Sequence, residues 1–415
     1  MRAIKGKQAR RSFSLALAGT LGVGNVFGVA IGIIIGGPGS LFWLVVSMFF
    51  AMVIKYSEVV LASDNLHHDT LTHGGMAYVL SSLDIRFGRS LSILYSVCVL
   101  VISFVMGAAL QSDAIVKSAR ASVGISPYLI AFGLVVLAFF SIIGGATTIE
   151  KITAIIIPLT TIIYIIITSS VIIANINNLE NVIFDILHSA FSSSSAVGGV
   201  LGFLMCAPLR EGFARGILSN EAGAGTSSMA HSRSGLLSPC SAGILGIFEV
   251  WFDTGLICML TGFSILLSVP DPSVFSDGMQ LIAYSVGNLF GNGGKHLLLF
   301  SVFAFAFATI ICWYYYGYEA WCTVFGKRKR ATFLPLFLAF VYLGCFSDTT
   351  LLILLTDLLM LLASSLALFA LVKSSDRIRE LSELGGVINS KNGRLRRLRV
   401  KNIKGILSSK EEKRL

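Results

Sequence analysis

A short glycine-rich interruption in the first apolar stretch is the first place where the sequence predicts chemistry. Residues 20–25 read Thr-Leu-Gly-Val-Gly-Asn, and apolar residues flank them on both sides. Unwound backbone at such a point exposes carbonyl oxygens to a cation, and the half-helix that follows presents N–H groups and a positive dipole end to a carboxylate. The alternative is close helix packing through small residues. Spacing alone leaves both interpretations open.

A second polar cluster spans residues 215–226, and it is rich in small residues. We place it at the cytoplasmic end of a predicted sixth span. One interpretation is a solvated loop with a helix cap. The other is a charge network that closes an inner gate, formed by Arg210, Glu211, Arg215 and Glu221.

Ionisable side chains also lie inside apolar stretches, where charge is costly and usually faces the interior of a helix bundle. Glu249 and Asp253 are four residues apart and therefore share a helix face. Gln111, Asp113 and Lys117 share the end of the third stretch. Structural pairing with an Arg or a hydroxyl group is the alternative to a functional role for these groups.

The eighth apolar stretch ends in an aromatic run that includes Trp313. An interfacial belt is one interpretation of such a run. However, Thr309 and Trp313 are four residues apart, so one helix face offers a hydroxyl group and then a large ring. A cation site and a wall of a substrate pocket are compatible with that face.

The composition indicates a polytopic membrane protein. Of 415 residues, 55% are apolar before glycine is counted and only 13% are charged, and the mean hydropathy is +0.81. Soluble proteins carry roughly a quarter charged residues. This excludes a disordered chain, a nucleic-acid-binding module and an ordinary cytosolic enzyme. No nucleophile–base pair, metal-ligand set or phosphate loop stands out, so we expect neither an enzyme nor a bound cofactor.

Membrane-spanning helices need about 20 mostly apolar residues. A weakly apolar segment at 280–292 is interpreted as a re-entrant or surface helix, and the short ninth stretch contains Pro335. The basic start and first apolar run also resemble a signal peptide, but the run is too long for one. We interpret ten stretches as spans: 13–35, 40–63, 91–113, 128–145, 152–174, 195–217, 241–268, 296–318, 331–346 and 350–372.

The distribution of Lys and Arg predicts the orientation. Loops on the side of both termini hold 26 of them and loops on the other side hold 3, which predicts cytoplasmic termini. We therefore expect three parts: a basic cytoplasmic N-terminus at 1–12, a transmembrane transport domain at 13–372 and a basic cytoplasmic tail at 373–415. The tail is interpreted as a topology anchor, with binding to anionic lipid as the alternative.

Several of these segments together resemble the alanine/glycine:cation symporter family, the sodium–alanine symporters, over roughly residues 12–325. The most specific stretch is Gly-Val-Gly-Asn-Val-Phe-Gly-Val-Ala at 22–30. Further matching segments are 36–39, 42–43, 55–58, 215–225, 249–254 and 313–317.

The resemblance implies an all-α, LeuT-type fold with a five-plus-five inverted repeat, set in the cell (inner) membrane. It implies symport of small neutral amino acids, chiefly alanine and glycine, usually with sodium. The sodium site implied by the family comprises Thr309 with main-chain oxygens near Ala18 and Leu21. The implied substrate-binding residues are Thr20, Gly22, Val23, Gly24, Asn25, Gln111 and Trp313.

The sequence also departs from the family pattern. An extra N-terminal span usual in the family is missing, and several polar positions are apolar here, namely Val23, Ala108 and Ala308. Two alternatives therefore stay open beside sodium-coupled symport. One is a transporter of the same fold with another substrate or with proton coupling, and the other is a transport-inactive membrane sensor or scaffold.

Overall fold

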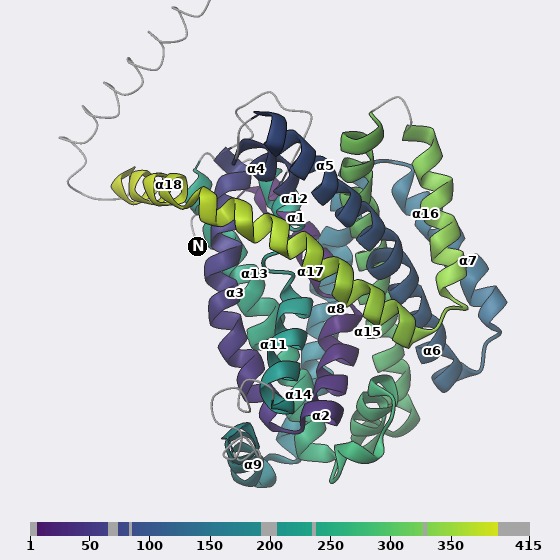
Figure 1. The fold of residues 1–415 in the computed structure, drawn as a ribbon. Coiled ribbons are helices and arrows are strands. Elements are labelled where there is room, and N and C mark those ends of the chain that lie inside the picture. The colour runs from purple at the N-terminus through teal and green to yellow at the C-terminus, as the bar shows by residue number, and fades with distance from the viewer. Residues whose placement is uncertain are drawn as a thin grey trace, which may run out of the picture.

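The computed structural model describes residues 6–64, 74–82, 85–191, 206–234, 238–326 and 330–388. These residues form a bundle of helices, and no β-strand occurs among them (Figure 1). Only structures that satisfy all their backbone hydrogen bonds internally can cross a bilayer, and an α-helix does so along its own length. The described chain is therefore an all-α, multi-pass membrane protein, as the composition predicts.

Nine of the ten predicted spans correspond to apolar helices in the described chain. Six are long enough to cross a membrane alone, two are shorter, and one is a pair bent by 49°. The first half contains the broken pair α1 (Lys7–Thr20) with η2 (Gly24–Gly28) and α2 (Val29–Gly36), then α3 (Gly39–Asp64), α4 (Gly75–Ser81), α5 (Ile85–Ile102), η4 (Ser103–Leu110), α6 (Gln111–Val123), α7 (Pro127–Ile142) and α8 (Ala146–Ala174), followed by η5 (Ile176–Asn178) and α9 (Leu179–Phe191).

The second half, like the first, contains one shorter apolar helix: α16 (Arg330–Gly344) in the second half and α7 in the first. Helix α18 (Ser375–Ile388) lies at the same end of the bundle as the start of α1, and α9 lies at the opposite end (Figure 1). The elements are α11 (Ala207–Asn220), α12 (Ser228–Ser232), α13 (Pro239–Val250), η7 (Trp251–Cys258), α14 (Met259–Ser268), η8 (Pro272–Val274), α15 (Gly278–Phe325), α16 (Arg330–Gly344), α17 (Thr349–Lys373) and α18 (Ser375–Ile388).

The sixth span differs from its prediction at 195–217. Residues 192–205 lie outside the described chain, and α11 begins only at Ala207. Helix α11 runs alongside α3, as the contact of Gly212 with Ser40 shows. The chain beyond α11 still follows α3, since Ser227 is hydrogen-bonded to Lys55.

The sixth span therefore continues past α11 through an irregular segment into α12. The polar cluster at 215–226 lies within this span and not at its end. Hydropathy places the sixth span in the apolar run before this cluster. A hydropathy window cannot register that the polar residues within 219–232 are buried by neighbouring helices.

The segment predicted as a re-entrant or surface helix is the first part of α15. Gly291 breaks this element with φ 57° and ψ −141°, a backbone conformation that glycine adopts easily. Before the break, Gly278 lies against the carbonyl oxygen of Phe27. The first part of α15 thus packs on the end of the broken first span, and the part after Gly291 contains the eighth span.

The close packing of α11 on α3 gives a first prediction. A β-carbon on Gly212 would lie 2.5 Å from the Ser40 carbonyl oxygen and 2.6 Å from Trp43 Cβ. We expect Gly212→Ala to lower the free energy of unfolding by about 1–3 kcal/mol through overpacking. Gly133→Ala in α7 is the matched control, since no atom lies within 4 Å of a β-carbon there. Thermal unfolding of both variants in detergent measures the difference, and equal stability would contradict the tight α3–α11 contact.

Candidate functional site

The backbone of the first span is broken where the glycine pattern predicts it. Helix α1 ends at Thr20, the Gly22 N–H donates back to the Thr20 carbonyl oxygen at 2.8 Å, and helical structure resumes at Gly24. The carbonyl end of α1 and the N–H end of η2 therefore face a common space. Partial negative and positive charges gather at these two ends.

Side chains from the third and eighth spans meet at this break. Gln111 Oε1 accepts a hydrogen bond from the Val23 N–H at 3.2 Å. A β-carbon on Gly22 would lie 3.0 Å from Thr309 Oγ1 and 3.1 Å from Gln111 Oε1. Gly22 thus allows two polar side chains to approach the unwound backbone. The sequence marks polar residues in each of these spans, but it does not show that they meet.

Thr309 lies among main-chain oxygens. Its hydroxyl group is 3.0 Å from the Phe305 carbonyl oxygen and 3.5 Å from that of Leu21. Ala18 is fully buried in the last turn of α1, and the buried Thr20 hydroxyl has no hydrogen-bond partner among the described residues. The structure thus brings Leu21 and Thr309 together in an oxygen-rich position that a hard cation could occupy.

Trp313 is part of the bundle interior. Its indole is fully buried, and Nε1 donates to the Gly19 carbonyl oxygen at 3.3 Å. A β-carbon on Gly107 in η4 would lie 2.3 Å from Trp313 Cβ. The ring therefore lies between α1 and the third span, and an interfacial belt is the wrong interpretation for this residue.

The sixth span contains a second break that sequence reasoning missed. Between Asn220 and Ser228 the chain has positive φ at Glu221 (54°), Gly223 (93°) and Gly225 (73°). The available signal was the same as in the first span, namely glycines among small polar residues in a membrane segment. The assignment of this stretch to a loop at the membrane edge concealed it.

A hydrogen-bonded cluster connects the two breaks. Asn25 Nδ2 donates to Ser219 Oγ at 3.1 Å and to Asp253 Oδ1, and Ser219 Oγ donates to Asp253 Oδ2 at 2.5 Å. All three side chains are buried, and Thr254 also donates to Asp253. Asn25 therefore fastens the start of η2 to the end of α11 and to the seventh span.

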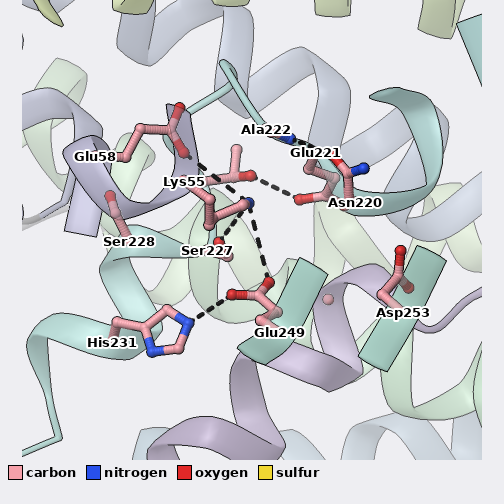
Figure 2. A network of polar contacts seen from close by, with 12 residues as sticks. Lys55, Glu58, Asn220, Glu221, Ala222, Ser227, Ser228, His231, Glu249 and Asp253 are labelled. Atoms are coloured by element: carbon pink, nitrogen blue, oxygen red, sulfur yellow. Dashed lines mark hydrogen bonds and ion pairs between the residues drawn. The ribbon is translucent and has the colours of Figure 1, made fainter. Parts of the chain in front are cut away.

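A second buried network lies on the other side of the sixth-span break (Figure 2). Lys55 Nζ donates to Ser227 Oγ at 2.8 Å and lies 3.9 Å from a carboxylate oxygen of Glu58 and of Glu249. His231 Nε2 is 2.5 Å from Glu249 Oε2. These side chains are fully buried. Sequence spacing does not connect these residues, because they come from three separate elements.

The structure separates the charges proposed for an inner gate. Arg215 pairs with Glu211 at 3.2 Å, and both lie against α2, where Glu211 Cβ is 3.0 Å from the position of a Gly36 β-carbon. Glu221 instead bonds Thr226 beside the Lys55 network. The single four-residue gate is therefore wrong.

At the end of the third span, Asp113 and Lys117 contact each other, whereas Gln111 contacts the first-span break. Asp113 Oδ2 pairs with Lys117 Nζ at 3.1 Å and accepts a hydrogen bond from Thr349 Oγ1 at 2.5 Å. These residues line a small cavity together with Val23 and Phe27. The cavity thus lies between the first-span break and the start of the tenth span.

Comparisons with known proteins agree with this arrangement. A sequence profile described as the sodium:alanine symporter family matches residues 4–382. The sodium/alanine symporter AgcS of Methanococcus maripaludis is 30% identical over 322 residues, which cover 75% of this chain and 70% of AgcS. An uncharacterized transporter of Haemophilus influenzae is 29% identical over 365 residues, 86% of this chain and 80% of that protein.

A solved structure shows the fold. The crystal structure of MhsT in complex with L-phenylalanine superposes with a TM-score of 0.65 at 11% identity, and the match covers 88% of each chain. The LeuT-type arrangement expected from the sequence is therefore confirmed.

Proposed function

Because the chain belongs to the sodium:alanine symporter family, we propose that it takes up small neutral amino acids, alanine and glycine, together with sodium. Family membership makes it a transporter and not an enzyme, and it supports cation-coupled amino-acid symport. The observation that carries the finer proposal is the meeting of two broken helices at Asn25 and Ser219.

The ends of the broken first helix suit the two charges of an amino acid. The positive N-terminal end at Gly24 favours a carboxylate, and the carbonyl end of α1 at Thr20 favours an ammonium group. The Val23 N–H is held by Gln111 Oε1 in this structure. We propose that the substrate carboxylate replaces this amide oxygen, so that Gln111 fills the site between transport cycles.

The same arrangement supports a sodium site and a size limit. The Thr309 hydroxyl with the carbonyl oxygens of Leu21 and Ala18 is the proposed sodium site. Trp313 is the proposed wall of the substrate pocket, because its ring lies fully buried between α1 and η4.

The proposed placement is the cell membrane, with both termini in the cytoplasm. It retains a basic start at 1–12, a transport domain at 13–372 and a tail at 373–415. The described part of the tail is helical, and it packs on the bundle through Arg377, which pairs with Asp64 at 2.9 Å.

Uptake of radiolabelled alanine into proteoliposomes tests the proposal directly. Sodium-driven accumulation against a gradient is the expected result. Binding without accumulation would support the sensor or scaffold alternative, and accumulation driven by a proton gradient alone would support the alternative coupling.

Gly24→Ala tests the carboxylate site. A β-carbon on Gly24 would lie 3.8 Å from Ser219 Cα, which is an ordinary contact, so the fold should tolerate it. We expect near-normal thermal stability and at least a tenfold loss of alanine affinity, because the methyl group occupies the approach to the backbone. Gly28→Ala is the control, with its β-carbon 3.9 Å from Arg215 Cδ. Lost stability with retained affinity in Gly24→Ala would indicate a packing face.

Trp313→Ala tests the size limit. Removing the ring should weaken alanine binding and allow leucine to compete, because a side chain that walls a pocket excludes larger ligands by overlap. Trp313→Phe keeps most of the wall and loses the hydrogen bond to Gly19, so it should still exclude leucine. Competition between leucine and alanine, measured on folded samples of both variants, tests this expectation. Normal alanine binding without leucine entry in Trp313→Ala would place this ring outside the pocket.

Thr309→Ala tests the sodium site. Ala308 supplies no side-chain oxygen, so Thr309 is the only hydroxyl group of this pair. We expect the sodium concentration for half-maximal uptake to rise by at least about tenfold. Thr309→Ser retains the hydroxyl group and should stay close to the wild type. An unchanged sodium dependence in Thr309→Ala would assign the ion to another site.

A further inference from the structure

Glu221 occupies an unusual backbone position in the sixth-span break. Its φ of 54° is the only positive value among the non-glycine residues that the structure describes. A left-handed conformation is unfavourable for a residue with a side chain, compared with glycine. Glycines follow at 223 and 225 in the same segment, so a carboxyl side chain at this position suggests a role for the carboxyl group itself.

The carboxyl group of Glu221 is fully buried and lacks a cation. Its Oε2 is 2.6 Å from Thr226 Oγ1, and its Oε1 has no hydrogen-bond partner among the described residues. Within the described chain no Lys, Arg or His nitrogen lies within 4.0 Å of it. Lys55, the ammonium group drawn beside it in Figure 2, is hydrogen-bonded to Ser227 and paired with Glu58 and Glu249.

The other two carboxylates of the network are better compensated. Glu58 Oε1 accepts from the Gly225 N–H at 2.9 Å and its Oε2 faces Lys55. Glu249 faces both Lys55 and His231. Three ionised carboxylates around one lysine would leave buried charge uncompensated. Such charge costs several kcal/mol, and a buried acid normally becomes neutral instead.

A proton fits the missing positive charge better than a metal cation does. A sodium ion needs several oxygens close around it, and the centre of this network is held by the Lys55 ammonium group, which repels a second cation. A proton needs only one oxygen. The Thr226 hydroxyl donates to Glu221 Oε2 at 2.6 Å, which leaves Oε1 as the oxygen that carries the proton.

We propose that Glu221 is a proton-binding site, occupied in this conformation and emptied when the sixth-span break moves. Helix α12, which follows the break, contacts the first span, because Ser12 of α1 donates to the Ala230 carbonyl oxygen and Phe13 contacts the His231 ring. A role for this proton in a transport cycle rests on the symport proposed above. Proton binding by Glu221 is independent of that proposal.

Other titratable groups face the network, so the tests must distinguish a proton on Glu221 from a proton on one of them. The Tyr78 hydroxyl is buried without a hydrogen-bond partner among the described residues, and Tyr95 donates to the Ala224 carbonyl oxygen. The titratable and charged groups around Glu221 are Lys55 and Glu58 of α3, Tyr78 of α4, Tyr95 of α5, His231 of α12, Glu249 of α13, Asp253 of η7, and Cys312 and Tyr316 of α15.

Infrared spectroscopy of the purified protein at neutral pH, without alanine or sodium, reads the proton directly. We expect a carbonyl band of a neutral carboxyl group that shifts in heavy water. Glu221→Gln should lose this component and Glu58→Gln should retain it. Absence of the band in the wild type overturns the proposal even if no variant folds. A band that survives in Glu221→Gln and disappears in Glu58→Gln would move the proton to Glu58, and a band that survives in both variants would overturn the proposal.

Thermal unfolding against pH gives an independent measure. A folded state that holds a proton which the unfolded chain releases is stabilised at low pH and loses this stability as pH rises. One such proton changes the folding constant by up to about tenfold per pH unit. We expect this slope in the wild type above about pH 4, where glutamate carboxyl groups of an unfolded chain lose their protons, and a flatter profile in Glu221→Gln. Glu180→Gln, on an exposed part of α9, should match the wild type. Equal slopes in wild type and Glu221→Gln contradict the assignment.

These readouts separate the two proposals. If alanine uptake fails while the infrared band and the pH slope hold, only the proposed substrate and symport fall. If uptake succeeds and the band is absent, only the proton site falls.

Discussion

The need to satisfy backbone polar groups inside a membrane is the constraint on which this structure depends. Unwound backbone is tolerated at bilayer depth only where it is buried in protein or lines a cavity. Here the first-span break at Gly22 faces Gln111 and Thr309, and the start of η2 is fastened to the sixth span through Asn25 and Ser219. Each broken helix thus supplies part of the polar surroundings that the other needs.

Charge compensation follows from the same low-dielectric surroundings. Lys55 lies between Glu58 and Glu249 and reaches Ser227, so one ammonium group connects α3, α13 and the segment after α11. Breaking a buried ion pair is costly because a partner remains uncompensated. The irregular segment of the sixth span is therefore held by hydrogen bonds to charged side chains where helical hydrogen bonds are missing.

The sequence predicted what depends on local pattern and missed what depends on neighbours. Apolar length identified nine of the spans, and the glycines at 22 and 24 identified the first break. The sixth span was misplaced because its polar residues are hidden by other helices, a fact that no hydropathy window contains. The Lys55 network was missed for a related reason. Its members lie far apart in sequence, and only the packing of α3 against α11, α12 and α13 unites them.

The apolar residue at Val23 is compatible with the proposed site, although a hydroxyl group is usual in the similar family segment. In this structure the polar contact at position 23 is made by the main-chain N–H, which donates to Gln111. The Val23 residue itself borders the cavity that Asp113, Lys117 and Phe27 line. A site that binds through backbone groups depends on the conformation of the break, and this conformation rests on Gly22 and on the anchoring of Asn25. Loss of a hydroxyl group at Val23 therefore changes the border of the adjacent cavity and leaves the proposed carboxylate contact in place.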